Sequence, residues 1–148
     1  MTKLNPPMKL SELIADFEGL DDEEKLELLV ELSDELPFPS RGRAAGSTAE
    51  TCRVQECQTP VYLWVDVVDG RVRLEADVPR KSPTVRGLIT LMVQGLEDAS
   101  PAEVAGIPDD VIGYLGLQKA LGMQRQQGFR GVVARIKREV RKLADAAN

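Results

Sequence analysis

The sequence of 148 residues contains no histidine, and this absence excludes several kinds of catalytic site. Cys-His and Ser-His nucleophile pairs need an imidazole as their base, so neither pair is available. Most zinc sites use histidine or several thiolates, and iron–sulfur clusters normally take four thiolates. The chain has only two cysteines, Cys52 and Cys57, so one chain lacks the ligands for a zinc site or a cluster. A homodimer would pool four thiols, and the sequence leaves that arrangement open.

The sequence also lacks long apolar runs. No stretch has membrane-spanning length, and residues 1–8 have no signal-peptide core, so we expect a flexible N-terminus on a cytoplasmic protein with no membrane partner. Free thiols persist in such a reducing compartment. The net charge of −5 argues against nucleic acid as the main partner, because phosphate binding needs a basic surface. We interpret the cationic residues of the last predicted helix as a solvated face.

The patterns that are present predict one domain, residues 1–148, of the α+β class. Val61, Leu63, Val65 and Val67 alternate with other side chains, which predicts a strand, and Asp69-Gly70 predicts a tight hairpin turn into a second strand over 71–78. Apolar periodicity predicts helices over about 10–17, 21–36, 83–96, 113–122 and 125–146, and a short helix opening at Ser100-Pro101. The composition of residues 40–49 predicts a flexible loop. We therefore expect a small antiparallel β-sheet packed against several α-helices.

Cys57 is the side chain most suited to chemistry, because it opens a strongly apolar strand directly after a polar segment. The spacing Cys-x4-Cys does not match the Cys-x-x-Cys of a thioredoxin-like dithiol. A free thiol has a pKa of about 8.5, so a cation or a helix N-terminus must help it to ionise. Arg125, at the start of the last predicted helix, is the candidate for this role. The alternative is that Cys57 is a small buried apolar residue, and residue chemistry alone leaves both interpretations open.

Three spaced motifs resemble the SufE family. Residues 56–62, Glu-Cys-Gln-Thr-Pro-Val-Tyr, are similar to the family's Gly-Cys-Gln-Ser-x-Val-Trp. Residues 83–89, Pro-Thr-Val-Arg-Gly-Leu-Ile, resemble its Ile-Val-Lys-Gly-Leu-Ile helix. Residues 125–129, Arg-Gln-Gln-Gly-Phe, resemble its Ser-Arg-Ser-Gln-Gly-Leu segment. Three motifs in register are more specific than any one of them, and together with the order of the predicted elements the resemblance covers residues from about 10 to 143.

The resemblance implies an α+β fold like that of the scaffold protein IscU. It also implies a sulfur-transfer accessory protein that activates a cysteine desulfurase and is not a stand-alone enzyme. Cys57 would accept sulfur as a persulfide from a desulfurase of SufS type and pass it to an iron–sulfur scaffold. Arg125 would be the basic residue near the thiol, and Gln58 part of the loop that presents it. The chain itself would bind no cofactor and no metal, because the pyridoxal phosphate belongs to the desulfurase.

Glu56 stands where the family commonly has glycine. Because a carboxylate beside a thiol disfavours the thiolate, we expect Glu56 to raise the pKa of Cys57. Two other functions remain open at this point. The protein could be a redox regulator that forms a reversible Cys52–Cys57 disulfide, or an adaptor whose cysteines belong to the core.

Overall fold

The computed structural model describes residues 7–39 and 52–146. Most of the segment expected to be a flexible N-terminus, residues 1–8, and all of the predicted loop over 40–49 lie outside these residues. The described part contains two antiparallel strands and several helices, which confirms the α+β class. In chain order these are α1 (Met8–Ala15), α2 (Asp22–Ser33), β1 (Tyr62–Val68), β2 (Arg71–Asp77), α4 (Pro83–Gly95), α5 (Pro101–Ala105), α6 (Val111–Leu115) and α7 (Met123–Ala146).

The hairpin forms as the sequence predicts. Strands β1 and β2 pair with Tyr62 opposite Asp77 and Val68 opposite Arg71. Asp69 and Gly70 connect them with φ of 52° and 74°, as a two-residue turn between twisted strands requires. Alternate residues of β2 are buried, so the predicted apolar face of this strand is correct.

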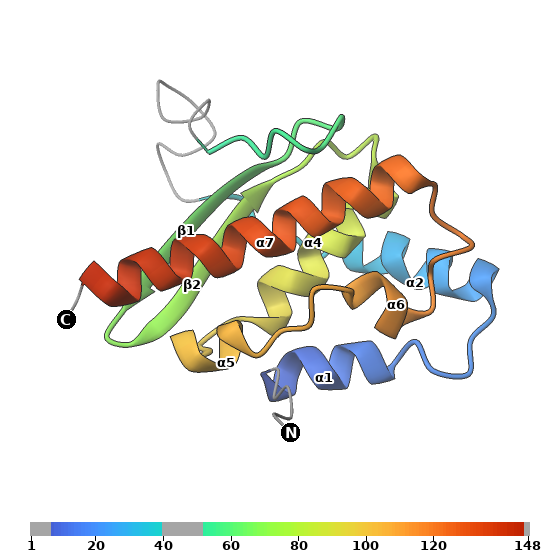
Figure 1. The fold of residues 1–148 in the computed structure, drawn as a ribbon. Helices are drawn as coiled ribbons and strands as arrows, with labels where there is room; N and C mark the ends of the chain where they lie inside the picture. Colours follow the sequence, from blue (N-terminus) through green and yellow to red (C-terminus); the bar gives the residue numbers. More distant parts are fainter. Residues whose placement is uncertain (1–6, 40–51, 147–148) are drawn as a thin grey trace.

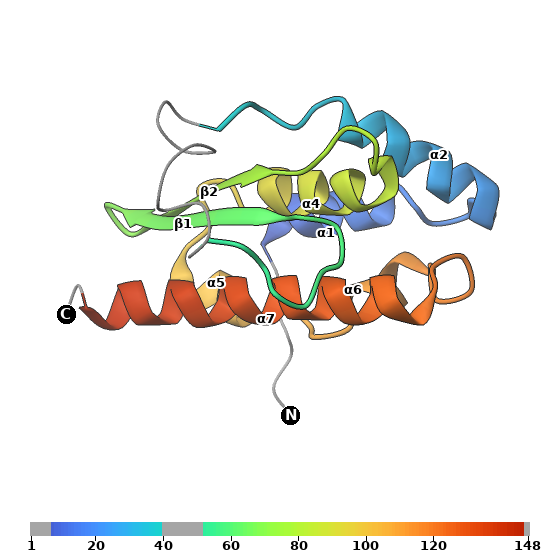
Figure 2. The same ribbon diagram turned by 90° about the horizontal axis from the view of Figure 1, so that it is seen from above.

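The elements form layers around α4. Figure 1 shows α7 crossing in front of the hairpin and α4, and Figure 2 shows α7, α5 and α6 on one side of them. Helix α4 packs against α1, α2 and β2, while α7 packs against β1, α5 and α6. The buried apolar residues of these elements form one continuous core. The carboxyl-terminal helix therefore covers the hairpin, and its amino-terminal half lies beside α4.

Helices α2 and α4 approach each other closely at Gly87. A Cβ atom at this position would lie 2.1 Å from the carbonyl oxygen of Leu29, so only glycine fits there. The neighbouring Arg86 is 7% exposed and donates hydrogen bonds from Nε to Ser33 O, at 2.7 Å, and from Nη1 to Val78 O. Burial of a guanidinium is costly unless its donors are satisfied, and these bonds join α4 to the ends of α2 and β2.

The three predicted helix starts are confirmed, two of them with a capping box. Asp21 and Ser100 each form a capping box, with Glu24 and Glu103 respectively. Ser82 precedes α4 as expected, but its side chain makes no capping hydrogen bond.

Other predicted helix details are wrong. The second helix ends at Ser33 and not near residue 36. The helix expected over 113–122 is α6, which starts at Val111 and ends where Gly116 adopts φ of 69°. A left-handed residue interrupts the helical hydrogen bonds, so the following residues form turns. The apolar periodicity of residues 125–146 predicts that Leu143 faces inward, but it is 37% exposed because the end of α7 extends beyond the core.

Candidate functional site

Cys57 lies in a loop whose two ends pair with each other. Val54 N–H donates to Val61 O at 2.8 Å, and Leu63 N–H donates to Cys52 O at 2.9 Å. An antiparallel bridge joins Arg53 to Tyr62. Residues 54–61, here called the Cys57 loop, therefore extend from the edge of β1 as a closed turn. Because residues 52–54 show no strand periodicity of their own, the sequence predicts a polar segment before the strand but not this pairing.

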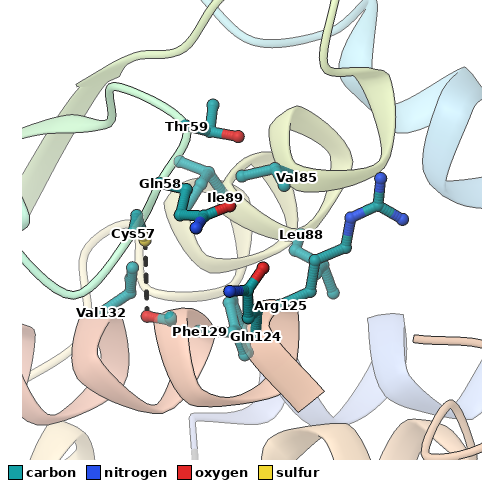
Figure 3. A pocket seen from close by; sticks show the side chains of 11 residues that line it. Cys57, Gln58, Thr59, Val85, Leu88, Ile89, Gln124, Arg125, Phe129 and Val132 are labelled. Carbon is teal, nitrogen blue, oxygen red and sulfur yellow. Dashed lines mark hydrogen bonds between the residues drawn. The ribbon is translucent and has the colours of Figure 1, made fainter. Parts of the chain in front are cut away.

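The Cys57 loop brings the thiol onto α7. The Sγ atom lies 3.5 Å from Gly128 O, and the Cys57 N–H donates to Val54 O at 3.3 Å. Figure 3 shows the side chain directed toward α7, with Gln58 and Thr59 beside it. The thiol is partly buried, so it is neither a fully enclosed core residue nor a freely exposed one.

A pocket of about 260 Å³ opens next to the thiol. Its apolar wall comes from α4 and α7, and its polar groups come from the Cys57 loop and the first turn of α7. The lining residues are Cys57, Gln58, Thr59, Val85, Leu88, Ile89, Gln124, Arg125, Gly128, Phe129 and Val132. The structure thus brings Cys57, Gln58 and Arg125 together around one pocket, although they come from segments far apart in the chain.

Arg125 shares the pocket without pointing at the sulfur. In Figure 3 its guanidinium extends away from Cys57, on the far side of Gln124. The charges that act on the thiol are instead those of Glu56 and Arg53. The role of Arg125 as the cation that assists Cys57 stays a prediction.

The pKa of Cys57 is raised from 9.0 to about 11. Burial is the largest cause, because it disfavours the charged thiolate, and the Glu56 carboxylate raises the pKa further. The Arg53 guanidinium lowers the pKa of Cys57, but by less than burial and Glu56 raise it. The upward effect expected of Glu56 is confirmed, and the resting thiol is a weak nucleophile.

Two glycines of α7 lie directly beneath the Cys57 loop, and the sequence analysis missed their role. A Cβ atom at Gly128 would lie 3.2 Å from Cys57 Sγ, and one at Gly131 would lie 2.7 Å from Glu56 Cβ. We call Gly128 and Gly131 the glycine pair. A glycine inside a strongly periodic helix often has a packing reason, and that signal was available in the sequence.

Cys52 does not line the pocket beside Cys57. It lines a second pocket with Trp64 and Arg135, whose Nη1 donates to Arg53 O at 2.7 Å. Both cysteines are free thiols, and they line different pockets. Within residues 7–39 and 52–146, no group of three or more Cys, Asp or Glu side chains is arranged to hold a metal ion.

Comparison with known proteins identifies the family. A family model named SufE, described as an Fe–S metabolism associated domain, matches residues 11–140. The chain belongs to the SufE family. An uncharacterised SufE-like protein of Mycobacterium tuberculosis is 38% identical over 137 residues, which are 91% of this chain and 93% of that protein. A SufE-like protein of Synechocystis is 30% identical over 131 residues, which are 87% of this chain and 78% of that protein.

The fold of this SufE-family chain also matches a solved structure. The solution structure of a hypothetical protein from Thermus thermophilus has a TM-score of 0.80 and 32% sequence identity, with 95% of this chain and 98% of that chain covered. Family membership assigns the protein to iron–sulfur metabolism and implies a cysteine desulfurase as its general kind of partner. In the described ranges, no helix combines the length and the apolar character needed to cross a membrane.

Proposed function

We propose that the protein accepts sulfur from a pyridoxal-phosphate-dependent cysteine desulfurase of SufS type and carries it as a persulfide on Cys57. The observation that carries this proposal is the position of Cys57, on a closed loop at the rim of an apolar pocket. A carrier must offer its thiol to one macromolecule and protect the product from other thiols. A thiol on a projecting loop, with apolar side chains beside it, is suited to both tasks.

The transfer is a thiol exchange and needs no oxidant. The Cys57 thiolate attacks the outer sulfur of the persulfide on the desulfurase cysteine, and a new S–S bond forms at Cys57. The S–S bond of the donor breaks at the same time, and the desulfurase cysteine leaves as a thiolate that takes up a proton. Repetition of the exchange with an iron–sulfur scaffold releases the sulfur for cluster assembly. This chemistry requires no histidine, in agreement with a sequence that contains none.

The raised pKa means that Cys57 must change its environment before it reacts. In the resting position the thiol is held next to Gly128 and is largely protonated at neutral pH. Movement of the Cys57 loop away from α7 would return the thiol to water and lower its pKa toward 9.0, because burial is the main cause of the shift. The desulfurase supplies the contacts that favour the moved loop. Gln58 and Arg125 line the pocket beside the thiol, which supports a role for both side chains in this contact.

Intact-mass measurement with a desulfurase tests the proposal. The protein is incubated with a SufS-type desulfurase and free cysteine, and we expect a mass gain of one or more sulfur atoms that a reductant removes. The gain should be absent in Cys57→Ser and retained in Cys52→Ser. If the wild-type protein shows no gain with a desulfurase of confirmed activity, the proposal is wrong.

Thiol counting on the same three proteins distinguishes a sulfur carrier from a redox regulator. A reversible disulfide needs both cysteines, so mild oxidation would remove both thiols of the wild-type protein and leave the one remaining thiol of each single Ser variant. Because Cys52 and Cys57 line different pockets, we expect both thiols to remain countable after mild oxidation.

A further inference from the structure

Glu56 is exposed, yet the aliphatic part of its side chain packs closely on α7. A Cβ atom built at Gly131 would lie 2.7 Å from both Cβ and Cγ of Glu56 and 2.9 Å from its Cδ. Real Cβ atoms do not approach other carbons so closely, so the Glu56 stem fills the space that a larger residue at position 131 would need. The stem is packed while the residue as a whole stays exposed, as is common for long charged side chains.

Gly128 makes a second contact one helical turn earlier. A Cβ atom there would lie 3.2 Å from Cys57 Sγ and 3.5 Å from Glu56 O. Residues three apart lie on the same face of a helix, so the glycine pair supports Cys57 and Glu56 side by side. Glycine inside a helix is destabilising relative to alanine, and here it permits the close approach of the loop.

We propose that Glu56 is the positioning residue of the Cys57 loop: its stem, packed on Gly131, holds the loop on α7 and keeps the thiol in its resting place until a partner lifts the loop. Part of this proposal, the role of the partner, depends on the proposed function. The contact between Glu56 and Gly131 and its effect on Cys57 do not.

The charge of Glu56 adds a second and separable effect. The carboxylate opposes ionisation of Cys57, and Arg53, which immediately precedes the loop, favours it. From the elements packed around the thiol, α7 contributes Gln124 and Arg125 to the pocket, and α4 contributes only apolar side chains. The stem of Glu56 thus holds the thiol in its partly buried position, and burial, followed by the Glu56 charge, opposes ionisation of the thiol.

Substitution of Gly131 tests the role of the stem. In a Cys52→Ser background, Gly131→Ala should displace Glu56 and release the loop. We expect hydrogen exchange of residues 54–61, and alkylation of Cys57, to become about three- to tenfold faster, as for loss of a typical contact. Alanine is the better helix former, so an unchanged or raised unfolding midpoint would show that the release is local. Gly122→Ala is the matched control, because a Cβ atom at Gly122 meets nothing within 4 Å.

Two substitutions of Glu56 separate its stem from its charge. Glu56→Gln keeps the stem, so exchange of the loop should be unchanged. The midpoint of the ultraviolet thiolate titration should fall, and alkylation at neutral pH should rise about two- to fivefold, because an exposed charge has a modest effect. Glu56→Ala should lower the titration midpoint further than Glu56→Gln, because release of the loop also reduces the burial of the thiol, and it should show the faster loop exchange expected for Gly131→Ala.

The proposal is overturned if Glu56→Ala leaves loop exchange at the parent rate, or if Glu56→Ala and Glu56→Gln are alkylated equally fast. Should Gly131→Ala lower the unfolding midpoint, Glu56→Ala decides the matter, since an exposed residue can be truncated without loss of the fold. None of these measurements uses a desulfurase, so failure of sulfur transfer and failure of the Glu56 contact are distinguished.

Discussion

At the scale of single residues, the reactivity of Cys57 is set by its neighbours. Burial and the adjacent Glu56 raise the pKa of the thiol, and Arg53 only partly opposes them. A thiol that is protonated at rest reacts slowly with small thiols and electrophiles, and under the proposed function this would protect Cys57 between encounters with the desulfurase. The same neighbours lead to two predictions that depend on pH.

Alkylation of Cys57 in the isolated protein should be slow at neutral pH. With a pKa of about 11, roughly one thiol in ten thousand is ionised at pH 7, because each pH unit below the pKa reduces the thiolate about tenfold. We expect the rate in Cys52→Ser to increase about tenfold per pH unit between neutral pH and about pH 10. Iodoacetamide labelling followed by mass spectrometry measures it. A rate that levels off near pH 8.5 would contradict the raised pKa.

Cys57 should also make stability depend on pH in the alkaline range. Its pKa is about 11 when folded and 9.0 in the unfolded reference, so the folded chain binds the thiol proton more tightly. The resulting contribution to stability is fully present below pH 9 and is lost as the pH rises through 11. Urea unfolding of Cys52→Ser and of the Cys52→Ser, Cys57→Ser double variant measures the effect. Their difference in stability should shrink as the pH rises.

At the scale of elements, close approaches between helices depend on glycine. Helix α4 meets α2 at Gly87, where the Leu29 carbonyl leaves no room for a side chain. Residues 83–89 resemble a helix motif of the SufE family, and the structure gives a physical reason for the glycine in this motif. The contact positions α4, which in turn provides the apolar wall of the pocket beside Cys57.

Gly87→Ala should destabilise the protein by about 1–3 kcal/mol or more, because the added methyl group must push α2 and α4 apart. Thermal and urea unfolding should both show the loss, with a Tm lower by several degrees. Gly122→Ala, where the added group meets open space, should change stability little. If the two variants are equally stable, α2 and α4 do not approach each other in solution as they do in the structure.

At the scale of the whole molecule, a buried cation joins three elements. Arg86 of α4 hydrogen-bonds the carbonyl groups of Ser33, at the end of α2, and of Val78, after β2. Burial lowers the pKa of Arg86, although guanidinium groups stay charged at neutral pH, and the carboxylates of Asp77 and Asp34 offset part of the lowering. This network lies on the side of α4 that meets α2, and the Cys57 loop lies on α7. The fold therefore separates the buried Arg86 network from the Cys57 loop.

Arg86→Met should cost about 2–5 kcal/mol, because it leaves two buried carbonyl groups without their charged donor. Arg80→Met, at an exposed position nearby, is the control and should change stability by less than about 0.5 kcal/mol. Urea unfolding measures both variants. If both variants change the free energy of unfolding by the same small amount, water replaces the hydrogen bonds of Arg86 without loss of stability.

The sequence alone determined the local structure and much of the chemistry. Asp69-Gly70 and the alternation beside it determined the hairpin, and the capping boxes at Asp21 and Ser100 determined two helix starts, because each of these signals acts within a few residues. The absence of histidine and the cysteine motif limited the chemistry to that of a thiol. The prediction that Glu56 raises the pKa of Cys57 also succeeded, since the two residues are adjacent in the chain.

Only the tertiary structure decided where the thiol lies. Cys57 contacts Gly128, which is 71 residues away in the sequence. The glycine pair makes room for the Cys57 loop, and the apolar periodicity of α7 does not show that this loop packs there. Such contacts depend on how α7 packs over the hairpin, which is a property of the whole core. For the same reason the sequence could not show how Arg125 lies relative to the thiol: in the folded chain it lines the same pocket, but its guanidinium extends away from Cys57.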